Sequence, residues 1–200
     1  SASFSVYNEP NGRAIPPTPT VGGVGLSADS ARRADYSSLQ PGQTLILLGE
    51  TRGELGASLY LREILGREDG APPPVDLAAE RRVGDFLRAM IRGEQVSVAH
   101  DLSDGGLIGA DMALASGVGI TLSLGSDLPA HAALFGEDQA RYLIAVDEAQ
   151  PLLAAAAAAG VTAREIGRAG GDSLAAQDLF DLPLNALRDA YEGWMPTYMA

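Results

Sequence analysis

The sequence has no cysteine and no lysine, and it has only two histidines. Without cysteine the chain has no disulfide framework, no thiolate zinc site and no cysteine nucleophile. Two imidazoles, His100 and His131, cannot build a histidine-rich metal centre. The formal net charge of −12 lacks the basic footprint that nucleic-acid binding requires, so we expect no nucleic-acid partner. A phosphate group would have to be held by backbone amides, by individual arginines or by a metal ion.

Long apolar runs are absent as well. The longest, at 45–48 and 152–159, are far shorter than a membrane span, and no charged-then-apolar leader opens the sequence. We therefore expect no membrane partner and a cytoplasmic location. A hydrophobic content of 46% in 200 residues suits one sizeable core. Alternation of strand and helix patterns, with a few strand-to-strand steps, predicts an α/β (α+β) fold in which helices cover a mixed β-sheet.

The segment Ala-His-Asp-Leu-Ser-Asp-Gly-Gly-Leu at 99–107 is the most distinctive part of the sequence. It follows an apolar strand pattern at 96–99 and precedes residues with helical spacing, at 107, 110 and 114. We expect Ser103 or Asp104 to cap that helix, and we expect Gly105 and Gly106 to let a ligand approach the backbone closely.

A helix start of this kind favours an anion, but the loop carries two carboxylates, Asp101 and Asp104. At about 5 Å in water each would repel a unit negative charge by roughly 0.8 kcal/mol. A magnesium-bound phosphate fits better, because Mg²⁺ takes one or two carboxylates together with phosphate oxygens. An ordinary strand-to-helix turn with a good cap remains an equal alternative for the loop alone.

Two further loops carry charge. Residues 50–56 follow a buried strand predicted at 44–49 and lead into a helix predicted at 58–65, and a simple connection is the alternative to a ligand contact. Residues 132–141 are predicted to form a polar turn before a strand at 142–146. That turn contains Glu137, Asp138, Gln139 and Arg141, and it is either a phosphate or substrate contact or an exposed charged turn.

The remaining elements follow from caps and periodicity. Asp76 is expected to cap a helix that ends at Gly93, and Asp147 a helix that Gly160 closes. Strands are predicted at 118–124 and 161–166, and a β segment at 20–26. A helical period at 179–191 is interrupted near Pro183.

Four stretches resemble, in order, one enzyme family. They are Ser-Val-Tyr-Asn-Glu at 5–9 with Pro-Thr-Pro at 17–19 and Val-Gly-Gly-Val-Gly at 21–25, Gly-Glu-Thr-Arg-Gly at 49–53, His-Asp-Leu-Ser-Asp-Gly-Gly-Leu at 100–107, and Phe-Gly-Glu-Asp-Gln-Ala-Arg-Tyr at 135–142. Together they resemble the last quarter of the phosphoribosylformylglycinamidine synthase large subunit. The wider family includes aminoimidazole ribonucleotide synthetase, selenophosphate synthetase and hydrogenase maturation factors.

The resemblance implies an ATP-dependent ligase of purine biosynthesis. In that family the amide oxygen of formylglycinamide ribonucleotide is phosphorylated by ATP, and ammonia from glutamine displaces the phosphate to give the amidine. The subunit has two pseudo-repeated halves, and this chain resembles the C-terminal domain of the second. By this comparison, residues 1–20 are a strand and connector from a preceding ATP-binding domain, and residues 21–200 are the C-terminal synthetase-like domain. The implied partners are the missing N-terminal domains, a glutaminase subunit and a small accessory subunit.

The resemblance also implies site residues. The last domain is expected beside a vestigial site that holds an auxiliary ATP or ADP with Mg²⁺, with Asp101 and Asp104 near the metal. The residues implied around the nucleotide phosphates and the adjoining pseudo-substrate pocket are Asp101, Ser103, Asp104, Gly105, Gly106, Glu137, Asp138 and Gln139. Ser5 matches a serine that contacts the substrate at the live site. Ala2 and Ser3 stand where the family has Gly-Asn, which removes its magnesium-binding asparagine. The family's catalytic histidine belongs to the missing half, so we expect no catalytic residue here and an isolated chain without activity.

Two alternatives stay open. One is a selenophosphate- or aminoimidazole-type synthetase domain, against which the Tyr-Asn-Glu and Glu-Thr-Arg-Gly stretches argue. The other is a non-catalytic packing or interaction domain whose glycine strands and aspartate loop bind no ligand. Surfaces that face missing domains would be more apolar than usual, so the isolated chain could form a homodimer.

Overall fold

The computed structural model describes residues 22, 24–26, 29–107, 109–125 and 127–199. The chain divides into two units, Ser1–Ser30 and Ala31–Ala200, and the description below concerns the second. Ser5, the strand predicted at the start of the chain and the predicted domain boundary between residues 20 and 21 lie outside the described residues.

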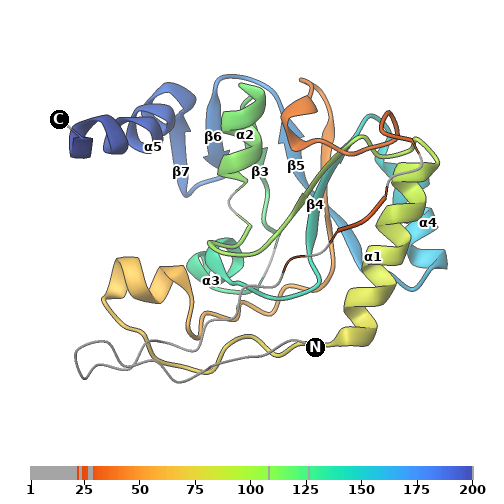
Figure 1. The fold of residues 1–200 in the computed structure, drawn as a ribbon, viewed down its shortest axis with the longest axis horizontal. Helices are drawn as coiled ribbons and strands as arrows, with labels where there is room; N and C mark the ends of the chain where they lie inside the picture. Colours follow the sequence, from red (N-terminus) through yellow and green to blue (C-terminus); the bar gives the residue numbers. More distant parts are fainter. Residues whose placement is uncertain (1–21, 23, 27–28, 108, 126, 200) are drawn as a thin grey trace. The chain divides into compact units, whose positions relative to one another are not determined.

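A seven-stranded sheet forms the centre of the described part of this unit, in the order β2-β4-β1-β5-β3-β6-β7 (Figure 1). Neighbouring strands are antiparallel, except that β3 and β6 are parallel, so the predicted mixed sheet is confirmed. The strands are β1 (Thr44–Leu48), β2 (Val98–Asp101), β3 (Ile120–Leu122), β4 (Tyr142–Val146), β5 (Ala163–Ala169), β6 (Ser173–Ala176) and β7 (Phe180–Pro183).

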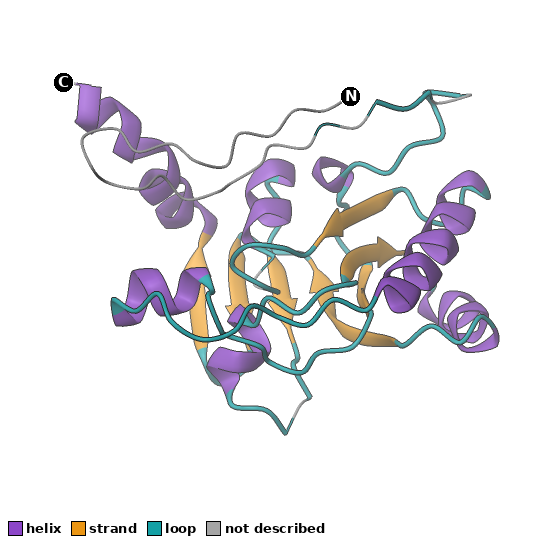
Figure 2. Cartoon of the chain, turned by 60° about the horizontal axis from the view of Figure 1, so that its bottom comes forward, coloured by secondary structure: helices purple, strands orange, loops and turns teal. Residues whose placement is uncertain are grey.

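Helices lie on both faces of this sheet (Figure 2). They are α1 (Leu77–Arg92), α2 (Ala110–Ser116), α3 (Ala130–Phe135), α4 (Ala149–Ala158) and α5 (Leu184–Met199), with a short 3₁₀ turn η2 (Tyr36–Ser38) and a π-helix η3 (Tyr60–Ile64). Side chains alternate between the two faces of a strand, and β1 uses both. Leu45 and Leu47 join a core with α2 and α3, whereas Ile46 and Leu48 join a core with α1 and α4.

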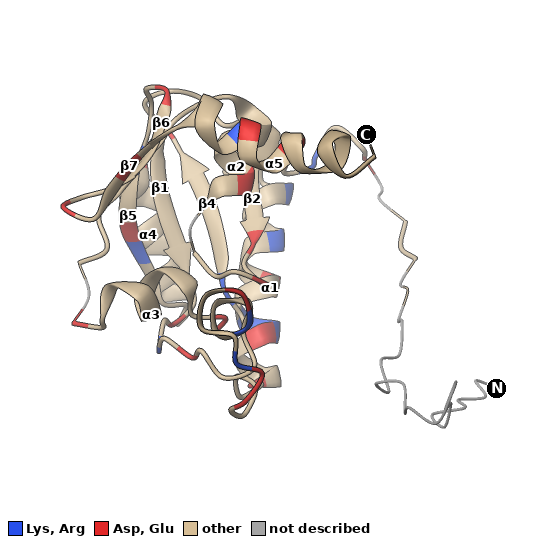
Figure 3. Cartoon of the chain, turned by 90° about the vertical axis from the view of Figure 1, so that its left-hand side faces the viewer, with Lys and Arg blue, Asp and Glu red and all other residues tan. Residues whose placement is uncertain are grey.

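Helix α1 forms as its sequence predicts. The Asp76 carboxylate accepts hydrogen bonds from the amides of Ala78 and Ala79, at 2.9 and 3.0 Å, and Gly93 ends the helix. Val83, Phe86 and Leu87 are buried at the helical spacing that places them on one face. Figure 3 marks acidic and basic residues along this helix.

Several local predictions were wrong. Helix α3 covers residues 132–135 of the polar turn predicted at 132–141, because the small and apolar side chains of Ala132, Ala133 and Leu134 are buried against the sheet. The helix predicted at 58–65, by contrast, is confirmed, because residues 59–65 are helical and η3 is the π-helical centre of that helix. Asp147 does not cap α4, since its carboxylate accepts a hydrogen bond from Gln43 Nε2 at 3.2 Å. Strands β6 and β7 were not predicted.

No helix within the described ranges is long and apolar enough to cross a membrane.

Candidate functional site

Three loops meet at the end of the sheet where β1 and β2 finish, and Glu137 joins them. Its Oε1 accepts hydrogen bonds from the backbone amides of Leu59, at 2.9 Å, and Gly105, at 3.0 Å. Its own amide donates to the Glu54 carbonyl at 2.8 Å. A single carboxylate therefore holds the loop after β1, the loop after β2 and the segment after α3 together.

The next residue, Asp138, is buried and supports the loop after β1. Its carboxylate accepts hydrogen bonds from the amides of Gly53 and Glu54, at 3.1 and 3.3 Å. Arg141 Nη1 lies 3.6 Å from Asp138 Oδ2, and Arg141 also donates to the carbonyls of Asp138 and Gly136. Burial lowers the pKa of the Arg141 guanidinium, and the charge of Asp138 opposes that change. This pair fixes where the loops sit.

Asp104 faces a polar hollow between these loops. The exposed carboxylate shares it with Arg62 on η3, and the other lining residues are Ala57, Ser58, Leu59, Glu68 and Glu137. The guanidinium of Arg62 carries a raised pKa, chiefly through its hydrogen bond to Glu63, with Asp104 adding a weaker electrostatic contribution. At Gly105, beside Asp104, an added Cβ would meet no atom within 4 Å, so the space on that side of the backbone is open. A polyanion with a bound cation suits such a mixture of charges.

Asp101 ends β2 and is exposed. Its Oδ1 lies 4.0 Å from Nδ1 of His100, and it does not line the hollow that Asp104 faces. Within the described ranges, no group of three or more His, Cys, Asp or Glu side chains is arranged to hold a metal ion. Ser103 is exposed, and its carbonyl accepts from the Gly106 amide at 3.2 Å in the turn between Asp101 and Leu107.

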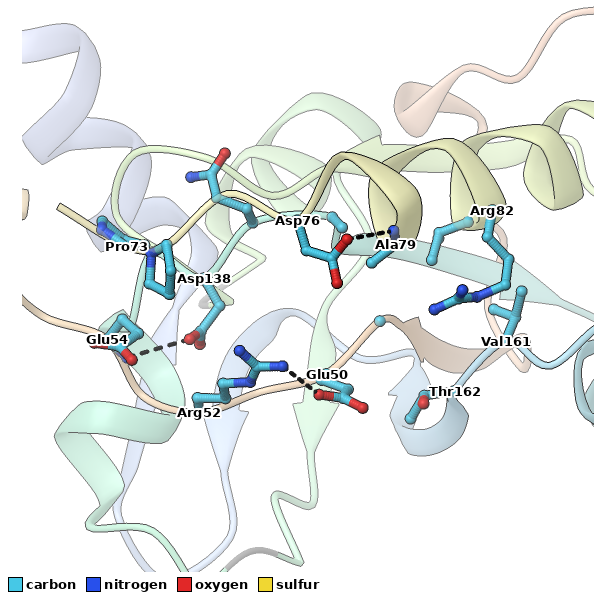
Figure 4. A pocket seen from close by; sticks show the side chains of 15 residues that line it. Glu50, Arg52, Glu54, Pro73, Asp76, Ala79, Arg82, Asp138, Val161 and Thr162 are labelled. Carbon is cyan, nitrogen blue, oxygen red and sulfur yellow. Dashed lines mark hydrogen bonds and ion pairs between the residues drawn. The ribbon is translucent and has the colours of Figure 1, made fainter.

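A second hollow lies on the other side of Asp138, and Gln139 lines it (Figure 4). Arg52 projects into the hollow and pairs with Glu50 at 2.9 Å, which raises the pKa of Arg52. Asp76, at the start of α1, lines the same hollow and already occupies the first amides of that helix. The predicted residues therefore divide, with Asp104 and Glu137 at one hollow and Asp138 and Gln139 at the other.

The capping expected in the aspartate loop was wrong. Helix α2 begins at Ala110, after Gly109 in the left-handed conformation, and no side chain caps it, so neither Ser103 nor Asp104 is its N-cap. Gly105 and Gly106 consequently do not frame a helix start. A Cβ on Gly106 would lie 2.7 Å from the carbonyl oxygens of Leu134 and Gly136, so this glycine allows a loop, rather than a ligand, to approach.

The chain matches the family described as AIR synthase related protein, C-terminal domain, over residues 40–178. The chain belongs to this family. It is 59% identical over 202 aligned residues to phosphoribosylformylglycinamidine synthase subunit PurL of Caulobacter vibrioides, a match that covers the whole of this chain and 27% of that protein. It is 49% identical over 204 residues to the PurL subunit of Methylocella silvestris, covering 28% of it. Thus this AIR synthase related domain spans about a quarter of the length of these relatives.

A solved structure has the same fold. Thermotoga maritima PurL complexed with FGAR superimposes with a TM-score of 0.67 and 18% identity, covering 79% of this chain and 30% of that one. At this identity the likeness establishes the fold of the family and nothing more.

Sequence reasoning missed two features of the site. Arg62 and Glu68 line the Asp104 hollow, but they lie in a stretch that shows only helical propensity. The burial of Arg141 was also missed. Its position three residues after Asp138 and directly before an apolar strand is the signal that could have revealed a buried ion pair.

Proposed function

We propose that this chain is the C-terminal domain of the second half of a PurL-type subunit, and that it acts within an enzyme converting formylglycinamide ribonucleotide, glutamine and ATP to formylglycinamidine ribonucleotide. The identity of 59% to a PurL subunit over the full chain is the observation that carries the proposal. The names of the Thermotoga maritima structures, complexed with FGAR and with ATP, support the choice of substrates.

The proposed reaction has two steps. ATP transfers its terminal phosphoryl group to the amide oxygen of the substrate. Water hydrolyses glutamine to glutamate and ammonia, and the ammonia then displaces phosphate, leaving ADP, phosphate and the amidine. This chain supplies no catalytic residue to either step in the proposal. Ser5, which lies outside the described residues, is proposed to contact the substrate.

The proposed role of the chain is to hold an auxiliary ADP or ATP with magnesium. The Asp104 hollow supports this role because it combines an exposed carboxylate with the Arg62 guanidinium, and the open space at Gly105 lets a phosphate approach the backbone. Asp104 would be the carboxylate nearest the metal, with Ser103 and Gly105 nearest the phosphates. Asp101, which does not line the hollow, and Gly106, which packs against backbone oxygens, would shape the loop without touching the nucleotide. Magnesium would offset the phosphate charge that these carboxylates otherwise repel.

The three residues at 137–139 are proposed to line the adjoining pseudo-substrate pocket. Oε1 of Glu137 and both carboxylate oxygens of Asp138 already accept backbone hydrogen bonds, so these two side chains would position the loops around the pocket. Gln139 is exposed and lines the second hollow, where its amide is accessible to a ligand.

The proposed setting is a cytoplasmic complex. Its other components would be the remaining domains of the subunit, a glutaminase subunit and a small accessory subunit. The share of the PurL relatives that the chain spans, 27 to 28%, supports the first of these partners.

A chimaeric subunit tests the proposal. These 200 residues would replace the matching segment of the Caulobacter vibrioides relative, with which they share 59% identity. We expect the chimaera to hydrolyse ATP in response to formylglycinamide ribonucleotide and ammonia, and a subunit without the segment to be inactive. Ammonia in place of glutamine removes any dependence on the glutaminase.

A folded chimaera that is inactive with this substrate would overturn the proposal. Activity with an aminoimidazole-type precursor or with selenide instead would favour the wider-family alternative. A chimaera that is active but shows no nucleotide bound near Asp104 would favour a packing role for this domain.

A further inference from the structure

Helix α5 carries an apolar stripe that continues past the end of the domain it packs on. Leu184, Leu187, Tyr191, Trp194 and Tyr198 are spaced by three and four residues in alternation, which puts them along one side of a helix. Figure 1 shows α5 starting next to β7 and extending away from the sheet.

The first part of this stripe is docked. Leu184 is buried in the core that β1 shares with α2, Leu187 packs against that core, and Arg188 Nη2 donates to the carbonyl of Leu114 at 2.8 Å. Beyond Arg188 the described side chains are all exposed. Tyr191, Trp194 and Tyr198 are exposed by 75%, 62% and 73%, and Met195 and Met199 lie beside them.

This stripe is large for a free surface. With ~200 Å² for each large side chain, Tyr191, Trp194, Met195, Tyr198 and Met199 together leave roughly 700 Å² uncovered. Free monomers seldom leave contiguous apolar patches much larger than a few hundred Å² without a functional reason. The indole of Trp194 and the ring of Tyr198 stack at 5.1 Å, so the patch is already ordered for contact.

The second half of α5 also needs support from packing. Gly193 and Pro196 lie inside the helix, and both residues favour a helix less than alanine does, proline least of all. A helix with such residues is held mainly by tertiary contacts, and within the described residues those contacts end near Arg188.

We propose that the exposed part of the stripe, together with Met195 and Met199 beside it, docks on the part of a PurL-length subunit that lies outside these 200 residues. This inference rests on the proposed function. The matched relatives are nearly four times as long as the chain, so most of their polypeptide is available as the occupant. The surface that receives the stripe is apolar, with polar groups at its rim for the two tyrosine hydroxyls.

Two other occupants fit less well. Helix α5 has one arginine against two acids, Asp189 and Glu192, whereas a helix that binds anionic lipid carries a basic polar face. A second copy of the chain would bring another charge of −12, so the two copies would repel each other.

Trp194 is the only tryptophan of the chain, so its fluorescence reports directly on the stripe. In the isolated chain we expect exposed emission that acrylamide quenches readily. In the chimaeric subunit, the signal of Trp194 is obtained by subtracting the spectrum of the chimaera carrying Trp194→Phe. We expect this signal to shift to the blue and its quenching constant to fall several-fold. Adding the relative's polypeptide without its matching segment to the isolated chain should produce the same change.

Equal quenching in the isolated chain, in the chimaera and in the mixture overturns the docking. Shielding of Trp194 in the isolated chain, whether it depends on concentration or not, overturns it in favour of a second copy or of the chain's own N-terminal unit. The ammonia-dependent activity of the chimaera is measured separately from the fluorescence of Trp194. An active chimaera with an exposed Trp194 refutes the docking alone, and an inactive one with a shielded Trp194 refutes the proposed function alone.

Discussion

Arg141 and Asp138 form an ion pair under the loops, with Nη1 and Oδ2 3.6 Å apart and both side chains buried. Replacing Asp138 by alanine leaves the guanidinium without its charge partner and frees the amides of Gly53 and Glu54. We expect the free energy of unfolding to fall by about 3–5 kcal/mol, measured by urea denaturation. Asp181→Ala, at an exposed carboxylate on β7, is the control. A loss below about 1 kcal/mol, no more than an exposed pair contributes, would contradict the assignment.

Tyr142 links β4 to α1 through a hydrogen bond of 3.1 Å from its hydroxyl to Glu80 Oε1. Burial, and then the charge of Glu80, raise the pKa of Tyr142 to about 12. The unfolded chain has a tyrosine pKa of about 10, so the protonated form favours the native state. The contribution is complete below about pH 10 and is lost as the pH rises toward about 12.

Tyr142→Phe tests this linkage. We expect the variant to lose less stability than the wild type between about pH 10 and about pH 12, and to be about 1 kcal/mol less stable at neutral pH because it lacks the hydrogen bond. Urea midpoints at a series of pH values measure both effects. Tyr191→Phe, at an exposed site, should leave the pH profile unchanged, and identical profiles for all three proteins would refute the linkage.

Gly105 and Gly106 offer a matched comparison of two adjacent glycines. Both have positive φ, at 81° and 77°, but only Gly106 lies against backbone oxygens. Gly105→Ala should lower the free energy of unfolding by about 1 kcal/mol, the cost of a left-handed alanine. Gly106→Ala adds a steric clash of about 1–3 kcal/mol. Chemical denaturation measures both, and equal losses would show that the loop can move away from α3.

The proposed binding of a magnesium nucleotide depends on Asp104 more than on any other residue named here. Calorimetric titration of Mg-ADP into the chimaeric subunit should show a site whose affinity falls at least about tenfold in Asp104→Asn. Changing a residue that only supports a metal ligand already lowers affinity by about tenfold or more, and removing the ligand itself should lower it at least as much. Asp181→Asn should bind as the parent does. Unchanged affinity and metal dependence in Asp104→Asn would leave packing as the function of the loop.

The parts of this fold that local patterns determine could be predicted from the sequence. Helix α1 has a carboxylate cap, an apolar face and a terminal glycine, and the buried strands β1 and β4 are continuous apolar runs. By contrast, β6 is four residues long and pairs in parallel with β3, some 50 residues earlier. No local period encodes such a partner, because only the folded sheet brings the two strands together.

In the candidate site, too, local features could be predicted from the sequence and contacts between distant residues could not. Motif order identified the loops, but side-chain roles depend on neighbours distant in sequence. Glu137 bonds Leu59 and Gly105 across 78 and 32 residues, which no spacing rule anticipates. The predicted cap of α2 was wrong because a serine or an aspartate caps a helix only where the helix begins beside it. Helix α2 begins at Ala110, too far along the chain for Ser103 or Asp104 to cap it.

The pairing of β1 also has a consequence for synthesis of the chain. Thr44 pairs with Val146 on one side and with Arg168 on the other, so this apolar strand leaves the ribosome about 100 residues before either partner exists. At ~5–20 residues per second that interval lasts roughly 5–20 s. Throughout it, the Leu-Ile-Leu-Leu run lacks both of the strands that pair with it. Nascent chains stalled before residue 142 should therefore need a chaperone to stay unaggregated, whereas chains that extend past residue 169 should not.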